Sequence, residues 1–215
     1  LLIKNKLMCG INGTLITNNG LSEIDKNLLV EMRDTMIHRG PDGQGEWISD
    51  NGLIGFGHRR LSIIDLSDSA TQPMSTNDEQ IWITFNGEIY NHKELRNELN
   101  NSYDIDWKTD HSDTEVILYA YKYWGINCIK KFKGMFAFAL WDNNESNLYL
   151  VRDRIGIKPI YFSVLDGHIN FASEIKALLK DPKQKRKVNE TAFFHYLSFL
   201  TSPAPETLFE GIKKI

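Results

Sequence analysis

Apolar positions along the chain recur with two periods, one that favours strands and one that favours helices. Residues 9–17 are β-prone, and residues 135–141 alternate in the manner of a strand. Residues 81–85 form a strongly β-prone apolar run, and we expect this strand to stop at Asn86 and Gly87. Further short strands are predicted at residues 46–49, 53–58, 61–64, 148–152, 160–162 and 169–171.

Helical spacing predicts three longer helices among these strands. We expect Ser22 to cap the first, which runs to about Ile37, and Asn91 to cap the second. The third opens with a capping box at residues 112–115 and ends at Gly125. Because strands outnumber the amphipathic helices, we expect an α+β fold in which sheets pack face to face beneath covering helices. Shorter helices are predicted at residues 174–179 and 189–200.

Composition restricts the class of protein. With 215 residues, of which 41% are hydrophobic and 25% charged, the chain can form one large globular domain or two small ones. The net charge of −3 favours neither a nucleic-acid partner nor a membrane surface, and the basic run at residues 183–187 is typical of a solvated loop. No stretch approaches the roughly 18 apolar residues of a transmembrane helix. Residues 1–7 lead into no apolar segment of the kind that a signal peptide needs.

Cysteine and histidine usage bears on the redox setting and on metals. Cys9 and Cys128 are the only cysteines, too few for a disulfide framework, which favours a reducing, cytoplasmic setting. The six histidines show no zinc-ligand spacing, and no Cys-x-x-Cys motif occurs. We therefore predict neither a metal site nor another cofactor in this chain.

Cys9 is the first candidate for chemistry. If the chain begins at Met8 and that residue is removed, Cys9 carries a thiol together with a free α-amine. The amine has an ordinary pKa near ~7.7–8.0, which suits a general base at neutral pH. A buried, inert cysteine is the commoner alternative, and a Cys–His pair with His38 or His58 is another.

Other polar positions follow predicted strands or open helices. Asn86 and Gly87 offer two neutral donors, which an oxyanion hole requires, although the pair is also typical of a hairpin turn. Glu88 beside them could hold a cation, and one of the arginines at 59–60 could grip a carboxylate with two hydrogen bonds. Asp113 by default compensates the dipole of its helix, but it could equally accept hydrogen bonds from a ligand ammonium.

Several motifs occur together in one order and spacing over residues 8–179. They are Met8–Ile11, His38–Asp42, His58–Ile63, Gln72–Pro73, Phe85–Asn91, Ser112–Glu115 and Gly134–Phe138. Together they resemble the motifs of the class II glutamine amidotransferases, and most of all those of the glutaminase half of the glutamine-hydrolysing asparagine synthetases. The resemblance implies the N-terminal nucleophile (Ntn) hydrolase fold, a four-layer αββα sandwich of two antiparallel sheets.

The resemblance implies glutamine hydrolysis to glutamate and ammonia through a γ-glutamyl thioester. Cys9 would be the nucleophile and its α-amine the base. Asn86 and the Gly87 N–H would form the oxyanion hole, and the loop at residues 38–42 would close over the pocket.

The resemblance also implies how glutamine is held. Arg60 would bind the α-carboxylate of glutamine, and Glu88 and Asp113 would bind its α-ammonium. Leu61 and Ile63 would line the pocket.

A partner is implied as well. In this family the ammonia feeds a second active site, here an ATP-dependent synthetase domain that would bind ATP and Mg and amidate aspartate to asparagine. Its Ser-Gly-Gly-x-Asp-Ser loop is not found in this sequence. The expected organisation is an N-terminal extension at 1–7 that the active protein lacks, an amidotransferase domain at 8–187 and the start of a linker at 188–215.

Three points stay open at this stage. The glutaminase could feed a different acceptor, and the chain could form a homodimer. It could also be a non-catalytic glutamine-binding or scaffold domain, in which the extension leaves Cys9 blocked.

Overall fold

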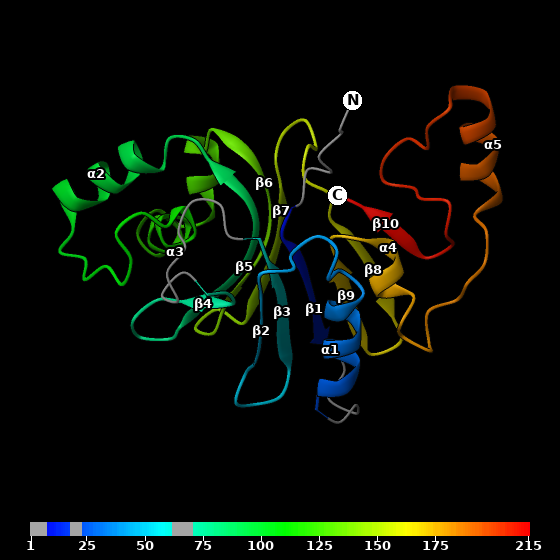
Figure 1. Cartoon of the computed structure of the whole chain (residues 1–215), viewed down its shortest axis with the longest axis horizontal. Helices are drawn as coiled ribbons and strands as arrows, with labels where there is room; N and C mark the ends of the chain where they lie inside the picture. The colour runs from blue at the N-terminus through cyan, green and yellow to red at the C-terminus, as the bar shows by residue number, and fades with distance from the viewer. Residues whose placement is uncertain (1–7, 18–22, 62–70) are drawn as a thin grey trace.

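The computed structural model describes residues 8–17, 23–61 and 71–215, which form two antiparallel sheets with helices on their outer faces (Figure 1). The larger sheet has the strand order β10-β8-β9-β1-β3-β2, and the smaller has the order β4-β5-β6-β7. The strands of the larger sheet are β1 (Gly10–Ile16), β2 (Gly43–Ile48), β3 (Ile54–Arg60), β8 (Tyr161–Leu165), β9 (His168–Ala172) and β10 (Ile212–Lys214). Those of the smaller sheet are β4 (Met74–Ser75), β5 (Ile81–Ile89), β6 (Gly134–Asp142) and β7 (Asn147–Arg152). The helices are α1 (Lys26–Asp34), α2 (His92–Ser102), α3 (Asp113–Trp124), α4 (Ile175–Leu178) and α5 (Glu190–Phe199), with a 3-10 helix at Ile126–Lys131.

Three apolar clusters define four layers. In the first cluster, Met32 of α1 and Ala177 and Leu178 of α4 pack against the larger sheet. Phe56 and Trp141 belong to a second cluster, which fills the space between the two sheets. Each large apolar side chain buried in this way contributes roughly 1.5–3 kcal/mol.

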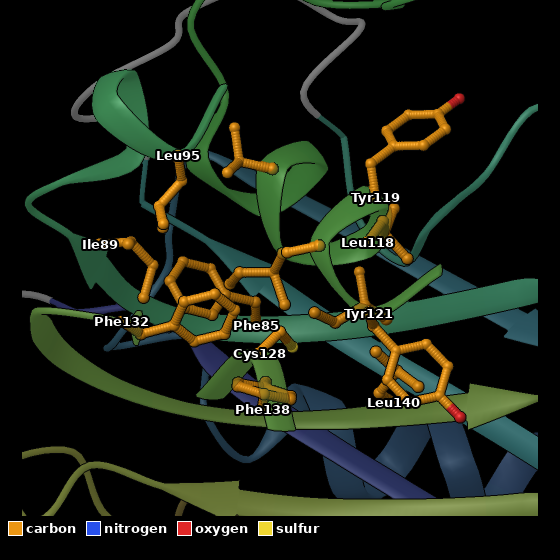
Figure 2. Packing of buried hydrophobic residues seen from close by; sticks show 14 of the residues in the cluster. Phe85, Ile89, Leu95, Leu118, Tyr119, Tyr121, Cys128, Phe132, Phe138 and Leu140 are labelled. Carbon is orange, nitrogen blue, oxygen red and sulfur yellow. The ribbon is translucent and has the colours of Figure 1, made fainter. Parts of the chain in front are cut away.

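The third cluster lies on the outer face of the smaller sheet, where α2 and α3 cover it (Figure 2). Phe85 and Phe138 come from β5 and β6, and Leu118 comes from α3. The predicted αββα sandwich of two antiparallel sheets is therefore confirmed.

β1 occupies the middle of the larger sheet. It pairs with β3, with Gly10 opposite Arg59, and on its other side with β9, with Asn12 opposite Ala172. The β-prone residues predicted as a strand at 9–17 thus pair with a neighbouring strand on each side. This pairing fixes the position of Cys9, the residue that precedes β1.

One predicted helix start is corrected, and a second is confirmed without its expected capping bond. α1 begins at Lys26 because the Asp25 side chain caps it, accepting from Asn27 N and Leu28 N; Ser22 lies outside the described residues. Asn91 precedes α2 but makes no capping bond with its side chain, because its Oδ1 accepts from Lys133 N instead.

The predicted capping box of α3 forms in part. Ser112 Oγ accepts from Glu115 N at 3.4 Å, as expected. The Glu115 carboxylate accepts from Lys108 N and Thr109 N, so it serves the preceding loop. The helix ends at Gly125, which has a φ of 63° and so adopts the left-handed region that favours glycine.

β5 is longer than the sequence predicts. The strand does not stop at Asn86 and Gly87 but continues to Ile89, because it pairs with β6 as far as Gly134. A Cβ at Gly87 would lie 2.4 Å from Met135 O, so glycine is required for this close approach. β3 ends at Arg60, and the strand predicted at 61–64 lies, from residue 62 on, outside the described residues.

Candidate active site

Cys9 stands at the start of β1 with its side chain partly buried. The Leu61 N–H donates to Cys9 Sγ at 3.3 Å, and the thiol lies 3.7 Å from Leu61 O. The backbone is fixed as well, since Arg39 Nε donates to Cys9 O at 3.0 Å and Ile11 N donates to Ser173 Oγ at 3.0 Å. The sulfur is therefore held in one place by the two strands that flank it.

Burial and charge oppose one another at this thiol. Burial raises the pKa of Cys9, and the Leu61 N–H and three nearby cations act to lower it. A raised pKa means that the thiol needs a base before it can act as a nucleophile. The cations, in order of effect, are Lys158, Arg60 and Arg39.

Gly87 presents its N–H on an open edge of β5. The Phe85 N–H on the same edge donates to Gln72 Oε1 at 2.6 Å, and the Ile89 N–H donates to Asp113 Oδ2 at 2.9 Å. Backbone amides two residues apart point the same way along a strand. The Gly87 N–H therefore lies between these two bonds, beyond the point where β4 stops pairing.

Asn86 supplies a second donor, its side-chain amide, which projects from one face of β5. Its side chain is 1% exposed, and its Nδ2 has no hydrogen-bond partner among the described residues. Thr84, on the same face of the strand, donates to Gly57 O in β3, so this face is turned toward the larger sheet. A buried, unpaired donor costs roughly 1–3 kcal/mol, which a ligand oxygen would relieve.

The residues predicted to hold glutamine come from β3, β5 and the first turn of α3. Arg60 ends β3 and acts electrostatically on Cys9, and Glu88 acts on Lys158, which also acts on Cys9. Asp113 is buried and tied to β5 through Ile89 rather than to Cys9. Burial raises the pKa of the Asp113 carboxyl to about 6.

The predicted pocket lining is described in part. Leu61 lies against the Cys9 sulfur through its backbone, and Ile63 lies outside the described residues. The structure thus brings Cys9, Leu61 and Arg60 together and places Asn86 and Gly87 side by side on the facing strand. Their roles in binding and chemistry remain predictions.

Neither histidine that was considered as a base contacts the sulfur. His58 Nε2 lies 3.1 Å from Phe85 O, and burial lowers the pKa of this imidazole to about 4. His38 is exposed and lies 3.0 Å from Glu174 Oε1. Neither imidazole is therefore hydrogen-bonded to the Cys9 thiol among the described contacts.

Two residues of this site were missed by sequence reasoning. Arg39, in the loop expected to close over the pocket, instead reaches Cys9 O with Nε and Glu174 Oε1 with Nη1, each at 3.0 Å. Lys158 is buried beside Met8, with Nζ 3.0 Å from Met8 Sδ. The motif at residues 38–42 could have pointed to Arg39. No local signal pointed to Lys158.

Within the described ranges, no group of three or more His, Cys, Asp or Glu side chains is arranged to hold a metal ion. The same ranges contain no helix that is both long enough and apolar enough to cross a membrane.

Comparison with known proteins adds relatives with stated activities. The chain is 40% identical to asparagine synthetase [glutamine-hydrolyzing] 1 of Bacillus subtilis, over 97% of this chain and 32% of that protein. It is 35% identical to a putative asparagine synthetase of Methanocaldococcus jannaschii, over 97% of this chain and 42% of the relative. The chain therefore spans about a third of the length of the curated relatives that it matches.

Solved structures support the fold. The glutamine phosphoribosylpyrophosphate amidotransferase of B. subtilis superposes with a TM-score of 0.68, covering 84% of this chain and 45% of that one, at 21% identity. At this identity the likeness establishes the fold alone, which is that of the Ntn hydrolases.

A family-level comparison covers nearly the whole chain. The sequence model of the glutamine amidotransferase domain matches residues 8–215, starting at Met8 immediately before the candidate nucleophile. This chain therefore belongs to the class II glutamine amidotransferase family.

Proposed function

We propose that this domain hydrolyses glutamine to glutamate and ammonia, with Cys9 as the nucleophile. The observation that carries the proposal is the unpaired, buried amide of Asn86, turned toward the sheet that holds Cys9. Gly87 beside it adds a backbone donor on the open edge of β5. Two neutral donors on a strand that faces the sheet holding Cys9 match the requirement of an acyl transfer.

Cys9 alone supplies both the nucleophile and the base. The sulfur attacks the side-chain amide carbon of glutamine, and the thiol proton passes to the Cys9 α-amine. Asn86 Nδ2 and the Gly87 N–H stabilise the oxyanion. The carbon–nitrogen bond then breaks, and the α-ammonium gives its proton to the departing ammonia. Water hydrolyses the thioester, releasing glutamate and restoring the thiol.

Charged residues fix the other end of glutamine in this proposal. Arg60 binds the α-carboxylate, and Glu88 and Asp113 bind the α-ammonium. Leu61 and Ile63 line the pocket between them. The support is that Arg60 and Glu88 act electrostatically on the Cys9–Lys158 pair, while Asp113 borders the Gly87 edge.

The N-terminus must be free for this mechanism. In the printed chain the Cys9 nitrogen forms a peptide bond with Met8, and an amide nitrogen is not a base. We therefore propose that the active form begins at Cys9 and lacks residues 1–8. The alternative is a scaffold domain that keeps these residues and stays silent.

For the ammonia acceptor we propose aspartate, amidated in a synthetase domain that binds ATP and Mg. The asparagine synthetase relatives support this, since they extend well beyond the matched third. A different acceptor is a second candidate, because an amidase of Gibberella zeae, chry2, is 37% identical over 87% of this chain. A cytoplasmic setting is part of this proposal, supported by two free cysteines. A homodimer remains a prediction.

Helix α5 supports a macromolecular partner of this kind. It lies at the margin of the molecule (Figure 1), and Phe194, Leu197 and Phe199 are 68%, 64% and 66% exposed. An apolar helix surface of this type is normally covered by protein. We propose that the synthetase domain packs against it.

Substitution of α5 tests this surface. Phe194→Ser with Leu197→Ser should abolish binding of a hydrophobic dye by the chain while leaving glutamine hydrolysis unchanged. Val164→Ser, at an exposed apolar residue in β8, is the matched control. Sedimentation measures the oligomeric state: a monomer would leave the surface for the synthetase domain, and a dimer that the double substitution dissociates would assign it to a second copy.

Comparing two forms tests the activity itself. One form begins at Cys9 and the other retains residues 1–8, each confirmed by intact mass, and glutamate release is measured for both. Only the first should be active, and Cys9→Ala should abolish its activity. Equal activity in both forms would exclude the α-amine as the base, and inactivity of both would favour the scaffold alternative.

A further inference from the structure

Lys158 is a buried lysine that the proposed steps do not use. It lies between β7 and β8 and is 6% exposed. Its backbone is anchored, since its N–H donates to Asp153 Oδ2 at 3.0 Å and its carbonyl accepts from Arg152 Nε at 2.8 Å. Its side chain extends to residue 8, where Nζ lies 3.0 Å from Met8 Sδ. The segment thus delivers one ammonium to the residue that precedes Cys9.

Among the described residues, the hydrogen-bond partner that the structure shows for this ammonium is Met8 Sδ, which is a poor one. A thioether is only a weak acceptor, and burying an ammonium without strong acceptors is costly. Such an arrangement adds little to the stability of the fold. A buried charge kept under these conditions is more consistent with a role in the chemistry beside it.

The charged surroundings of Lys158 come from four different segments. Burial lowers the pKa of the lysine, and the charge of Arg39 lowers it further. Cys9, Glu88 and Asp153 act in the opposite direction. On the Cys9 thiol, in turn, burial has the largest effect, and Lys158 exerts the largest effect of the cations. Each of the two groups, Lys158 and Cys9, thus affects the pKa of the other.

Removal of residue 8 would place a new titratable group beside this lysine. The Cys9 nitrogen, now bonded to Met8, would become an α-amine next to the position of residue 8, which the Lys158 side chain reaches. Two ammonium groups in one buried site repel each other, so the second is disfavoured. We propose that Lys158 is a positioning residue for glutamine hydrolysis, whose fixed charge keeps the α-amine of an N-terminal Cys9 uncharged and ready to accept the thiol proton.

Loss of the Lys158 charge should shift the pH dependence of glutamine hydrolysis in one direction. The reactive enzyme holds one proton on the amine–thiol pair of Cys9, and activity falls at low pH when a second proton binds. A nearby cation opposes that second proton, so removing the cation moves the acidic limb of the pH profile to higher pH. The loss of activity should therefore be large at low pH and small at high pH.

The test uses the chain that begins at Cys9, and it rests on the proposed function. We expect Lys158→Met to lower kcat/KM for glutamine about tenfold at pH 6 and by less than about twofold at pH 9. Lys158→Arg, which keeps the charge, should retain kcat/KM at pH 6 within about twofold. Lys180→Met removes a surface lysine next to Pro182 and Glu31, at the far end of β1, and should leave the whole profile unchanged. Thermal unfolding confirms that each variant is folded, and Lys158→Gln replaces Lys158→Met if that variant is not.

A second readout does not depend on turnover. Iodoacetamide alkylates Cys9, and mass spectrometry locates the modified residue. The pH profile of this alkylation rate should shift to higher pH in Lys158→Met. If the parent form hydrolyses glutamine and both profiles stay where they are in Lys158→Met, the inference is wrong and the proposed function stands. If the parent form releases no glutamate but alkylation shifts, the proposed function fails and the electrostatic inference holds.

Discussion

Asp113 Oδ2 accepts a hydrogen bond from the backbone N–H of Ile89 at 2.9 Å, joining the first turn of α3 to the open edge of β5. The carboxyl that is proposed to bind the glutamine ammonium is thus also a structural part of the strand that presents Gly87. Both functions require it to accept hydrogen bonds, and its burial opposes its ionisation.

This burial predicts how Asp113 changes stability with pH. The pKa of the carboxyl is raised from 3.8 to about 6, so the folded state binds its proton more tightly than the unfolded state does. The favourable contribution is complete below pH 4 and is lost as the pH rises through 6. Asp113→Asn should therefore gain stability relative to the parent by roughly 2–3 kcal/mol between pH 4 and pH 7.5. Urea unfolding at both pH values measures the difference; parallel changes in the two proteins would contradict the raised pKa.

Arg60 supplies a prediction about binding. If its guanidinium holds the glutamine α-carboxylate, Arg60→Ala should raise KM by about 10- to 100-fold, equivalent to the roughly 1.5–3 kcal/mol of a charged hydrogen bond. Arg154, which donates to Phe132 O and Lys130 O, offers a matched control because it lies away from Cys9 in the contacts described. An unchanged KM in Arg60→Ala would place the carboxylate elsewhere.

Asn86 supplies a prediction about turnover. Asn86→Ala should lower kcat by about 10²–10³, the usual loss for one oxyanion donor. Its effect on KM should be small, because the charge develops only in the transition state. Stability should be kept, since Nδ2 has no partner to lose among the described residues. Asn143→Ala, at the turn between β6 and β7, is the control; near-normal kcat in Asn86→Ala would move the oxyanion hole to other donors.

The sequence predicted what depends on neighbouring residues and missed what depends on distant ones. A β-prone run identified β1, alternation identified β6, and the Ser112 cap identified the start of α3. Asn86 and Gly87 resembled a turn because turn propensity is local, and pairing with β6 outweighed it. Lys158 could not be assigned because its side-chain contact lies 150 residues away, at Met8.

The family motifs support a different kind of prediction. They marked Cys9, Arg60 and Asp113 as a group even though no spacing in the chain brings them together. What they did not supply is the state of each group, such as the burial of Asn86 or the raised pKa of Asp113. Those properties arise from packing between sheets and can be obtained only from the fold.

Arg39 supplies the last prediction, which concerns the position of the nucleophile. Its Nε binds Cys9 O and its Nη1 binds Glu174 Oε1, so one guanidinium connects the start of β1 to the residue that precedes α4. Arg39→Ala should free the backbone of Cys9. A displacement of about 1 Å can cost on the order of 10² in rate, so we expect kcat to fall by about that factor with a smaller change in KM.

The two contacts of Arg39 can be separated by a double-mutant cycle with Glu174→Gln. If Glu174 acts only by orienting the guanidinium, Glu174→Gln should lower kcat moderately in the parent and have little further effect in Arg39→Ala. Arg39→Lys should not restore the rate, because a single ammonium cannot span both acceptors. Additive effects of the two substitutions on kcat would show that Glu174 acts independently of Arg39, and full activity in Arg39→Lys would show that charge alone is sufficient at this position.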